Sequence, residues 1–437
     1  MNIRNIIFFV IQIAMFFLSS TGVNGQLMTE KYIDLNRWIE EGSIERIITT
    51  KAGYAALGVI IQEECKGKTT VDDKCYMPFV IYFDENYNLG WYKTLDIKGL
   101  SNTGEVDILD DKDGNLLVLL VQGQVDDITN EFVNNTILLK LDKISGNTIW
   151  EKRYNGYANS MIKTDENNFV MAYQIKKEVD KYAKRDLKYT LMLRKFNNEG
   201  DVNWEKSILI SSRFLGLYNR DPRYFEMRCL DKEKIIFLYQ KMSLEKTIHQ
   251  YVPFQDGLWY EYRICNVNIV DGSIDSDFLI SDQKSNEFIE SWEIETNRNV
   301  ILFSHSKSYK MDEKYNYMRA DTLIYNIGAV NLNGGILWKK NIFKQGFESN
   351  NKQWFSELVF FKDRKFSLYT SSKLNITEYK FDQAKSIEQT KIPLSYKVVY
   401  GSKIKKIVTK SDGKILIISA YEYKNGETGF CFMEFLK

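Results

Sequence analysis

The chain has 437 residues and a formal net charge of +1, because its 59 basic side chains almost balance its 58 acidic ones. This balance argues against a nucleic-acid binder, which carries a basic surplus or a basic stripe. The only two histidines are His249 and His305, and no Cys/His spacing typical of zinc occurs. These features exclude a multi-histidine metal centre, and we expect neither a metal nor a cofactor.

The first 25 residues have the pattern of a secretory signal peptide. A basic residue, Arg4, is followed by an apolar stretch at 6–18 and by small and polar residues at 19–25. The apolar stretch is shorter than the roughly 20 residues that span a bilayer; an uncleaved anchor is the alternative. No second long apolar run follows, so we expect residues 26–437 to be secreted or periplasmic, without a stable membrane span.

A hairpin pattern recurs along the mature chain: an apolar strand, a tight polar turn and a more apolar strand. In one copy the turn is Asp111-Lys112-Asp113-Gly114. Turns of this type between apolar runs are strong hairpin signals. The pattern predicts hairpins at 46–62, 106–122, 161–174, 225–240, 292–305, 357–370 and 404–420.

A second pattern alternates with the first. An Asp or Asn ends one strand and a Trp follows on the next, often with a Gly between them where the turn needs positive φ. The pairs are Asp84 with Trp91, Asp142 with Trp150, Asn197 with Trp204, and Asn331 with Trp338. A further copy keeps Asn268 and Gly272 but has lost the Trp, and the copy around Asp382 lacks both Gly and Trp.

The two hairpins alternate with a period of roughly 50–65 residues, which fits four strands per blade of a β-propeller. The last copy stops at 429–435 without its final strand, and 32–40, which includes Trp38, resembles the missing Trp-bearing strand. We therefore predict an all-β, seven-bladed propeller in a single domain, 26–437. Its last blade is closed by the N-terminal strand, which removes an exposed sheet edge.

The stretch from Leu141 to Trp150, Leu-Asp-Lys-Ile-Ser-Gly-Asn-Thr-Ile-Trp, resembles the repeat of the PQQ-like (quinoprotein-type) β-propeller superfamily, and 196–204 and 330–338 are looser copies. The resemblance implies that the tryptophans pack between blades. Quinone-dependent members have eight blades and an adjacent Cys pair. This chain has neither, so a quinoprotein-like oxidoreductase is the least favoured function. The tryptophans concerned are Trp38, Trp91, Trp150, Trp204 and Trp338.

Five cysteines suggest at most a local disulfide. Cys65 and Cys75 flank a polar loop and could bridge it in an oxidising compartment. The other three lie in apolar strands and are expected to be free thiols. They are Cys229, Cys265 and Cys431.

Propeller geometry predicts that turns within hairpins lie on one face and that the longer connections lie on the other. Function concentrates on long loops held by a rigid scaffold, so we expect the binding site on the long-loop face. The aromatic residues there suit a protein or glycan partner, although they could also pack the loops onto the blades. The candidates are His249, Tyr251, Trp259, Tyr260 and Trp354.

The main enzymatic alternative is a glycan-active enzyme on the same ring, in which paired carboxylates meet near its axis. Asp256, Asp312 and Glu313 are examples of available carboxylates. No G-x-S-x-G elbow, phosphate loop or Cys–His pairing occurs, so no catalytic residue can be assigned. The sequence favours a binding or scaffolding module over an enzyme.

Overall fold

The computed structural model describes residues 26–35, 42–62, 75–95, 102–125, 132–178, 187–208, 225–243, 259–280, 287–295, 300–310, 318–346, 355–360, 365–371, 375–382, 385–393, 400–410, 412, 414–422 and 428–436. These residues form strands and turns and no helix. None of them therefore belongs to an apolar helix of membrane-spanning length.

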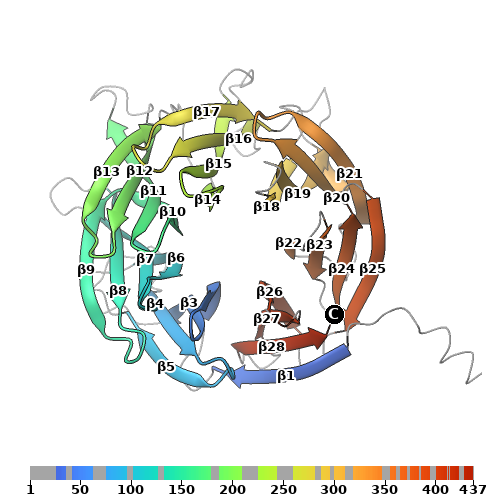
Figure 1. The fold of residues 1–437 in the computed structure, drawn as a ribbon, viewed down its shortest axis with the longest axis horizontal. Helices are drawn as coiled ribbons and strands as arrows, with labels where there is room; N and C mark the ends of the chain where they lie inside the picture. Colours follow the sequence, from blue (N-terminus) through green and yellow to red (C-terminus); the bar gives the residue numbers. More distant parts are fainter. Residues whose placement is uncertain are drawn as a thin grey trace, which may run out of the picture.

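Seven antiparallel sheets of four strands stand around a common axis (Figure 1). The predicted all-β, seven-bladed propeller is therefore confirmed. Blades 1 to 6 use consecutive strands, counted from the axis outwards, whereas blade 7 takes three strands from the C-terminus and one from the N-terminus. A single parallel pair, Tyr76 with Asn102, also links blades 1 and 2.

Each blade is a pair of hairpins. Blades 1 to 3 are β2 (Gly42–Thr50), β3 (Gly53–Gln62), β4 (Cys75–Phe83) and β5 (Leu89–Thr94); β6 (Asn102–Asp110), β7 (Leu116–Val125), β8 (Phe132–Leu141) and β9 (Thr148–Asn155); and β10 (Tyr157–Lys163), β11 (Asn168–Glu178), β12 (Leu187–Asn197) and β13 (Val202–Ile208). Blades 4 to 7 are β14 (Phe225–Cys229), β15 (Lys234–Ser243), β16 (Trp259–Asn268) and β17 (Ile274–Leu279); β18 (Glu287–Glu295), β19 (Val300–Lys310), β20 (Met318–Asn331) and β21 (Ile336–Gly346); β22 (Phe355–Phe360), β23 (Lys365–Ser371), β24 (Asn375–Asp382) and β25 (Lys385–Pro393); and β26 (Tyr400–Thr409), β27 (Ile415–Glu422), β28 (Thr428–Leu436) and β1 (Gln26–Asp34).

Strand β1 closes the ring by pairing antiparallel with β28, from Gln26 opposite Leu436 to Asp34 opposite Gly429 (Figure 1). The predicted closure is confirmed, but its position along the sequence was wrong. The strand comprises Gln26–Asp34 rather than 32–40, and Trp38 lies outside the described residues. Pairing with β28 and burial of Leu35 directly after the strand fix this position, whereas the Trp pattern had suggested a later one.

The alternating strand directions give the ring two distinct faces. The turns within hairpins lie on one face, here called the short-turn face, and the connections between hairpins leave from the other, the long-loop face. Because β28 ends and β1 begins beside the short turns, both ends of the ring lie on the short-turn face.

The core lies between neighbouring blades. In β7 the run from Leu116 to Val121 is buried on both sides, which explains why it is apolar without alternation. Leu116, Val118 and Leu120 pack against blade 1, whereas Leu117, Leu119 and Val121 pack against blade 3.

In blades 1 to 5 the turn of the outer hairpin begins with an Asp or Asn whose side chain accepts backbone N–H groups. Asp142, for instance, accepts the N–H of Ser145 at 2.8 Å. Gly146 follows with φ of +67°. A Cβ on Gly146 would lie 2.7 Å from Trp91 of the preceding blade, so this position needs glycine for space as well as for backbone conformation.

The outermost strand of each blade is also kinked against its partner. A register shift occurs in the pairing of the outermost strand of every blade, which leaves one extra residue on that strand, or two in blade 5. In blade 2, for example, the shift lies between Lys140 and Leu141 and the extra residue is Ile149. Equivalent shifts occur in the other six blades.

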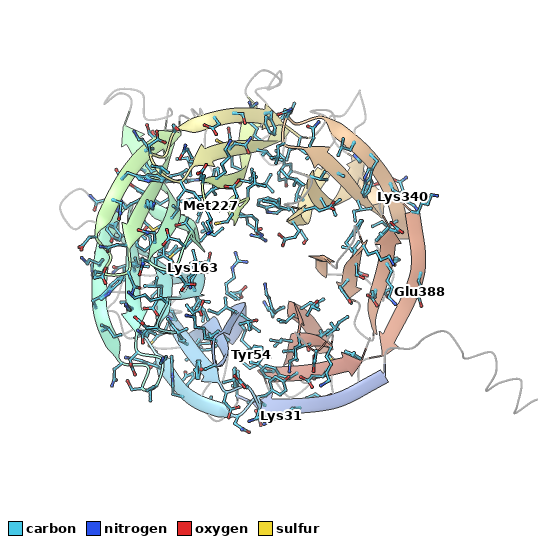
Figure 2. All side chains as sticks on the ribbon, in the orientation of Figure 1. Lys31, Tyr54, Lys163, Met227, Lys340 and Glu388 are labelled. Atoms are coloured by element: carbon cyan, nitrogen blue, oxygen red, sulfur yellow. The ribbon has the colours of Figure 1, made fainter. Side chains whose placement is uncertain are left out.

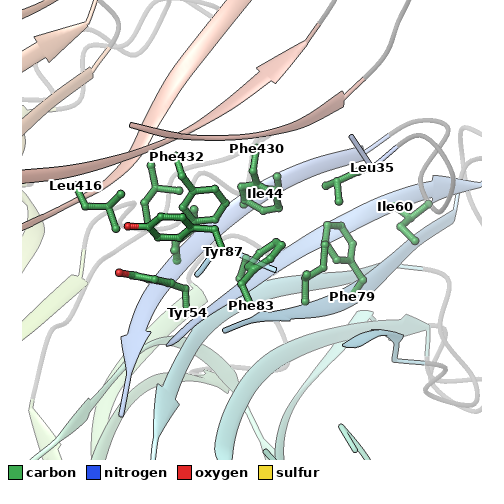
Figure 3. Close-up of a cluster of buried hydrophobic side chains, with 14 residues drawn as sticks. Leu35, Ile44, Tyr54, Ile60, Phe79, Phe83, Tyr87, Leu416, Phe430 and Phe432 are labelled. Carbon is green, nitrogen blue, oxygen red and sulfur yellow. The ribbon is translucent and has the colours of Figure 1, made fainter. Parts of the chain in front are cut away.

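The seam between blades 7 and 1 differs from the other interfaces. Tyr87 occupies the turn position that is glycine in blades 2 to 5, and it has φ of +61°. Its ring stacks on Phe432 at 4.7 Å and lies 5.5 Å from Tyr54, within a buried aromatic cluster (Figure 3). Its hydroxyl donates to Glu434 and accepts from Lys410 at 2.6 Å, so one side chain ties the closing blade to the first.

Candidate functional site

The candidate site is the inner edge of the ring, where the first strands of all blades face the axis. In Figure 2, Lys163 and Met227 lie on this inner side, whereas Lys31, Lys340 and Glu388 lie on the outside. The first strands of blades 1, 2, 3, 5 and 7 each contain a register shift. Such bulges redirect side chains and are frequent beside functional sites. The residues after the shifts are Arg46, Asp107, Ser160, Ser291 and Lys406.

Asp107 links blade 2 to blade 3. Its Oδ2 accepts the backbone N–H of Met161 at 3.0 Å, and its Oδ1 accepts the N–H of Ile108 at 3.0 Å. Because β10 is the innermost strand of its sheet, the N–H groups on its inner edge have no partner among the described strands, and the Asp107 carboxylate accepts one of them. Burial raises the pKa of the Asp107 carboxyl, against the opposing effect of the Arg46 charge.

Glu226 occupies the corresponding position in blade 4 and bonds to blade 5. Its Oε2 accepts the Nε1–H of Trp292 at 2.8 Å and lies 3.2 Å from Nη2 of Arg228. Arg228 also lies 3.7 Å from Glu293 and places its Cζ 5.1 Å from the ring of Trp292, which is 1% exposed. This polar network is held against an apolar interface, so its geometry is rigid.

The inner part of blade 3 contains buried side-chain oxygens that lack a hydrogen-bond partner within the described parts of the chain, and blade 4 contains a thiol near them. Ser160 takes the position of Asp107, but its Oγ has no hydrogen-bond partner among the described residues. The same holds for Oδ1 of Asn159 and for Oε1 of Gln174, which lies in the paired strand opposite Tyr157. These acceptors could receive hydrogen bonds from a small donor-bearing ligand. Nearby, the Sγ of Cys229 donates to the Lys163 carbonyl at 3.3 Å, and burial raises the thiol pKa to about 11.

Charge is unevenly distributed around the axis. Strand β26 of blade 7 contains Lys403, Lys405 and Lys406 and no acidic residue, whereas β18 of blade 5 contains four glutamates and no basic residue. Among the described residues, no group of His, Cys, Asp and Glu is arranged to hold a metal ion. The innermost strands therefore combine blade-to-blade bonds with a basic strand in blade 7 and an acidic strand in blade 5.

We expect the stability advantage of the wild-type protein over an Asp107→Asn variant to shrink as the pH rises from about 4 to about 8. The raised pKa means that the folded state binds the Asp107 proton more tightly than the unfolded state. Ionisation of Asp107 above that pKa therefore destabilises the folded wild-type protein, whereas asparagine does not ionise and the variant is not destabilised in this way. Urea unfolding at the two pH values measures the difference; a constant difference would contradict it.

The tryptophans of the outer strands contact the following blade. Nε1 of Trp91 donates to the carbonyl of Lys143, and Nε1 of Trp204 donates to that of Ile269, both at 2.9 Å. Trp150 lies against Gly200 of blade 3. In blade 4, whose copy lacks the Trp, Phe278 lies against Gly334 of blade 5.

The remaining tryptophan of this set packs on the next sheet. Trp338 stacks on Phe366 of blade 6 with centroids 6.3 Å apart. No partner can be given for Trp38, which lies outside the described residues.

The predicted binding residues fall mostly outside the described residues. His249, Tyr251 and Trp354 lie there entirely. Trp259 and Tyr260 begin β16, with backbones opposite Ser243 and Met242, but their side chains are not described.

The cysteines divide in the same way. Cys65 lies outside the described residues and Cys75 begins β4, so their disulfide stays a prediction. Cys229, Cys265 and Cys431 are free thiols, and the last two are buried.

Sequence reasoning missed the inner-edge residues Asp107, Glu226 and Arg228. It treated their strands only as apolar halves of hairpins. A signal was present: each is a charged residue inside a strand whose neighbours are apolar. The register shift that brings Asp107 to the inner edge leaves no mark in the hydrophobic pattern, however.

No family model matches this chain, and a comparison with curated proteins gives no match. Its structure is similar to the β-propeller domain of the Trilobed protease from Pyrococcus furiosus, with 13% identity and a TM-score of 0.44 over 90% of this chain and 94% of that one. It is also similar to the polysaccharide lyase Uly1, with 8% identity and a TM-score of 0.49 over 94% and 99% of the two chains. These similarities are too low to carry an argument, and the propeller fold rests on the strand pairing described above.

Proposed function

We propose that this chain is an exported β-propeller that serves as a binding or scaffolding module, with its partner held on the long-loop face. The supporting observation is the strand topology. The connections between hairpins all leave from one face, and both ends of the ring lie on the opposite face. The start of β1 and the end of β28 therefore do not occupy the face from which the connections leave.

Two further features belong to this proposal. The leader-like residues 1–25 support export, to the periplasm or to the outside of the cell. The repeat is of the PQQ-like type, used here for architecture and not for quinone chemistry. The inner-edge carboxylates Asp107 and Glu226 are engaged in bonds between blades, which favours a structural use of the axis.

The partner is a protein or a glycan, bound by the connection 244–258 between β15 and β16. This connection contains His249 and Tyr251 and is followed directly by Trp259 and Tyr260. Aromatic side chains of this kind supply large contact areas with little entropy to lose. Trp354 immediately precedes β22, whose first residue lies at the same face.

We expect that replacing residues 244–258 by a short Gly-Ser linker abolishes partner binding and leaves the melting temperature nearly unchanged. Loop changes have a small closure cost, about 0.6 kcal/mol for each doubling of length. Glycan arrays and affinity capture with the mature protein identify the partner, and titration calorimetry then compares the variant.

The matched control is a change on the other face, Lys112→Ser with Asp113→Ser, in an exposed turn of blade 2. This control should bind as the wild type does. Equal binding by the loop variant, or loss of binding in the turn variant, would place the partner elsewhere.

A glycan-active enzyme is the second candidate, supported by two carboxyls of β6 near the axis. Burial raises the pKa of both Asp107 and Asp110, and a general acid needs such a shift. The two candidates differ in one measurement on polysaccharides. Binding without release of new ends supports the module, whereas turnover that is lost in Asp107→Asn with binding retained supports the enzyme.

A further inference from the structure

The strand that closes the ring begins directly after the predicted leader. Gln26 is the first residue after the predicted leader, and it is also the first residue of β1, paired with Leu436. The residues before it, Val23-Asn24-Gly25, place small or apolar side chains one and three positions before this point, as signal-peptide cleavage requires. Cleavage there makes a structural residue the N-terminus of the mature chain.

Aminopeptidases could digest strand β1 from its N-terminal residue, Gln26. It is the outermost strand of blade 7 and pairs with β28 along one edge only, and chain termini fray unless they are tied down. Its contacts beyond the sheet come later in the strand: Nζ of Lys31 donates to the Asn86 carbonyl at 3.0 Å and to Oδ1 of Asn88 at 2.7 Å. Removal of residues one at a time from Gln26 would shorten the pairing with β28 and then break these bonds to blade 1.

We propose that Gln26 is cyclised to pyroglutamate in the mature protein and that this modification protects the closing strand from aminopeptidases. The inference rests on the proposed export, because it needs Gln26 as the first residue. An N-terminal pyroglutamate carries no free amine, which is the group that aminopeptidases bind.

The chemistry needs no co-reactant. The neutral α-amino nitrogen of Gln26 attacks Cδ of its own side-chain amide, and the new C–N bond closes a five-membered lactam. The Cδ–Nε2 bond breaks, and the amide nitrogen leaves as ammonia with the proton that the amine gives up. The α-amino group has a pKa of about 7.7–8.0, so a large share of it is neutral and nucleophilic near neutral pH.

The test uses the full precursor, expressed with its own leader in an exporting bacterial host and purified through a C-terminal tag. Mass spectrometry of the intact protein and of its N-terminal peptide is done before and after prolonged incubation at neutral pH. We expect a first residue of Gln26 and a mass lower by one ammonia. The matched control is Gln26→Asn, whose shorter side chain would need a four-membered ring and keeps its free amine.

A second measurement examines the protective role. Both proteins are treated with a broad-specificity aminopeptidase, and N-terminal residues and melting temperature are followed over time. We expect the wild type to lose no residue. The Gln26→Asn protein should be trimmed, and its melting temperature should decrease as trimming proceeds.

Three results would overturn the proposal. An unmodified Gln26 terminus refutes cyclisation and leaves export intact, whereas a different first residue refutes the leader boundary as well. Equal trimming of the two proteins refutes protection.

Discussion

Deletion of residues 26–34 is expected to be among the most damaging changes that this chain can suffer. It removes β1 and leaves blade 7 with three strands, so the ring loses the hydrogen-bonded pairing of Gln26–Asp34 with Thr428–Leu436 that joins its two ends. It also removes the bonds from Lys31 to blade 1. We expect a loss of at least about 3–5 kcal/mol, as for removal of a large buried aromatic side chain. Thermal unfolding followed by circular dichroism measures the loss.

Two controls make this result specific to the closing strand. A chain that begins at Gln26 lacks only the leader and should melt like the exported protein. A synthetic peptide of sequence 26–34, added to the deleted protein, should raise its melting temperature, because a ligand that binds only the folded state stabilises it. An unchanged melting temperature after deletion would mean that the ring does not depend on β1.

Tyr87→Ala is the second change with a large expected effect. The side chain is 5% exposed and stacks on Phe432 (Figure 3). Its hydroxyl also bonds to Glu434 and Lys410 across the seam. We expect a loss of about 3–5 kcal/mol, the usual cost of truncating a buried aromatic ring. Chemical denaturation gives the value, and Ile144→Ala, in an exposed turn of blade 2, is the control with little effect.

Two other substitutions separate the contributions of Tyr87. Tyr87→Phe keeps the ring and removes the hydroxyl, so we expect a loss of about 1–3 kcal/mol for the bonds to charged groups. Tyr87→Gly empties the same space as alanine but relieves the left-handed backbone, which costs about 1–2 kcal/mol in other residues. Glycine should therefore be less harmful than alanine; the reverse order would show that the backbone at this turn is not strained.

Acid should weaken the same seam. Burial raises the pKa of Glu434, but the hydrogen bonds from Lys410 and Tyr87 and the charge of Lys410 outweigh it, and the pKa is lowered from 4.5. A carboxyl with a lowered pKa stabilises the fold above its unfolded-state pKa and loses this contribution as the pH falls through the folded-state value. Glu434 therefore makes its full contribution to stability only at pH values above the ordinary pKa of a glutamate carboxyl.

The architecture was predictable because the repeats are local. Turn residues such as Asp142 and Gly146 act within a few positions, and their caps and positive φ angles are found where the pattern places them. Alternation of two hairpin types then led to seven blades and to closure by the N-terminus. The hairpins were inferred from signals between neighbours in sequence, whereas the closure was inferred from the strand that the last copy of the pattern lacks.

The seam was harder to predict because it depends on distant partners. The Trp pattern suggested that Trp38 lies on the closing strand, but β1 ends at Asp34. Tyr87 instead reaches back from blade 1 toward blade 7, in the opposite direction to the tryptophans of blades 1 to 3. A tyrosine where other copies have glycine was the available sign. Phe278, two positions beyond the lost Trp, was missed for the same reason: its partner, Gly334, is in another blade.

The kinked outermost strands have a consequence for behaviour at high concentration. An unbroken, flat strand edge can recruit a strand from another molecule and start a fibre. In this protein each outward edge carries an extra residue, Ile149 in blade 2 for example, which interrupts the ladder that an incoming chain would extend. Molecules of the closed ring should thus stay separate even when crowded, and self-association should begin only where β28 has been uncovered.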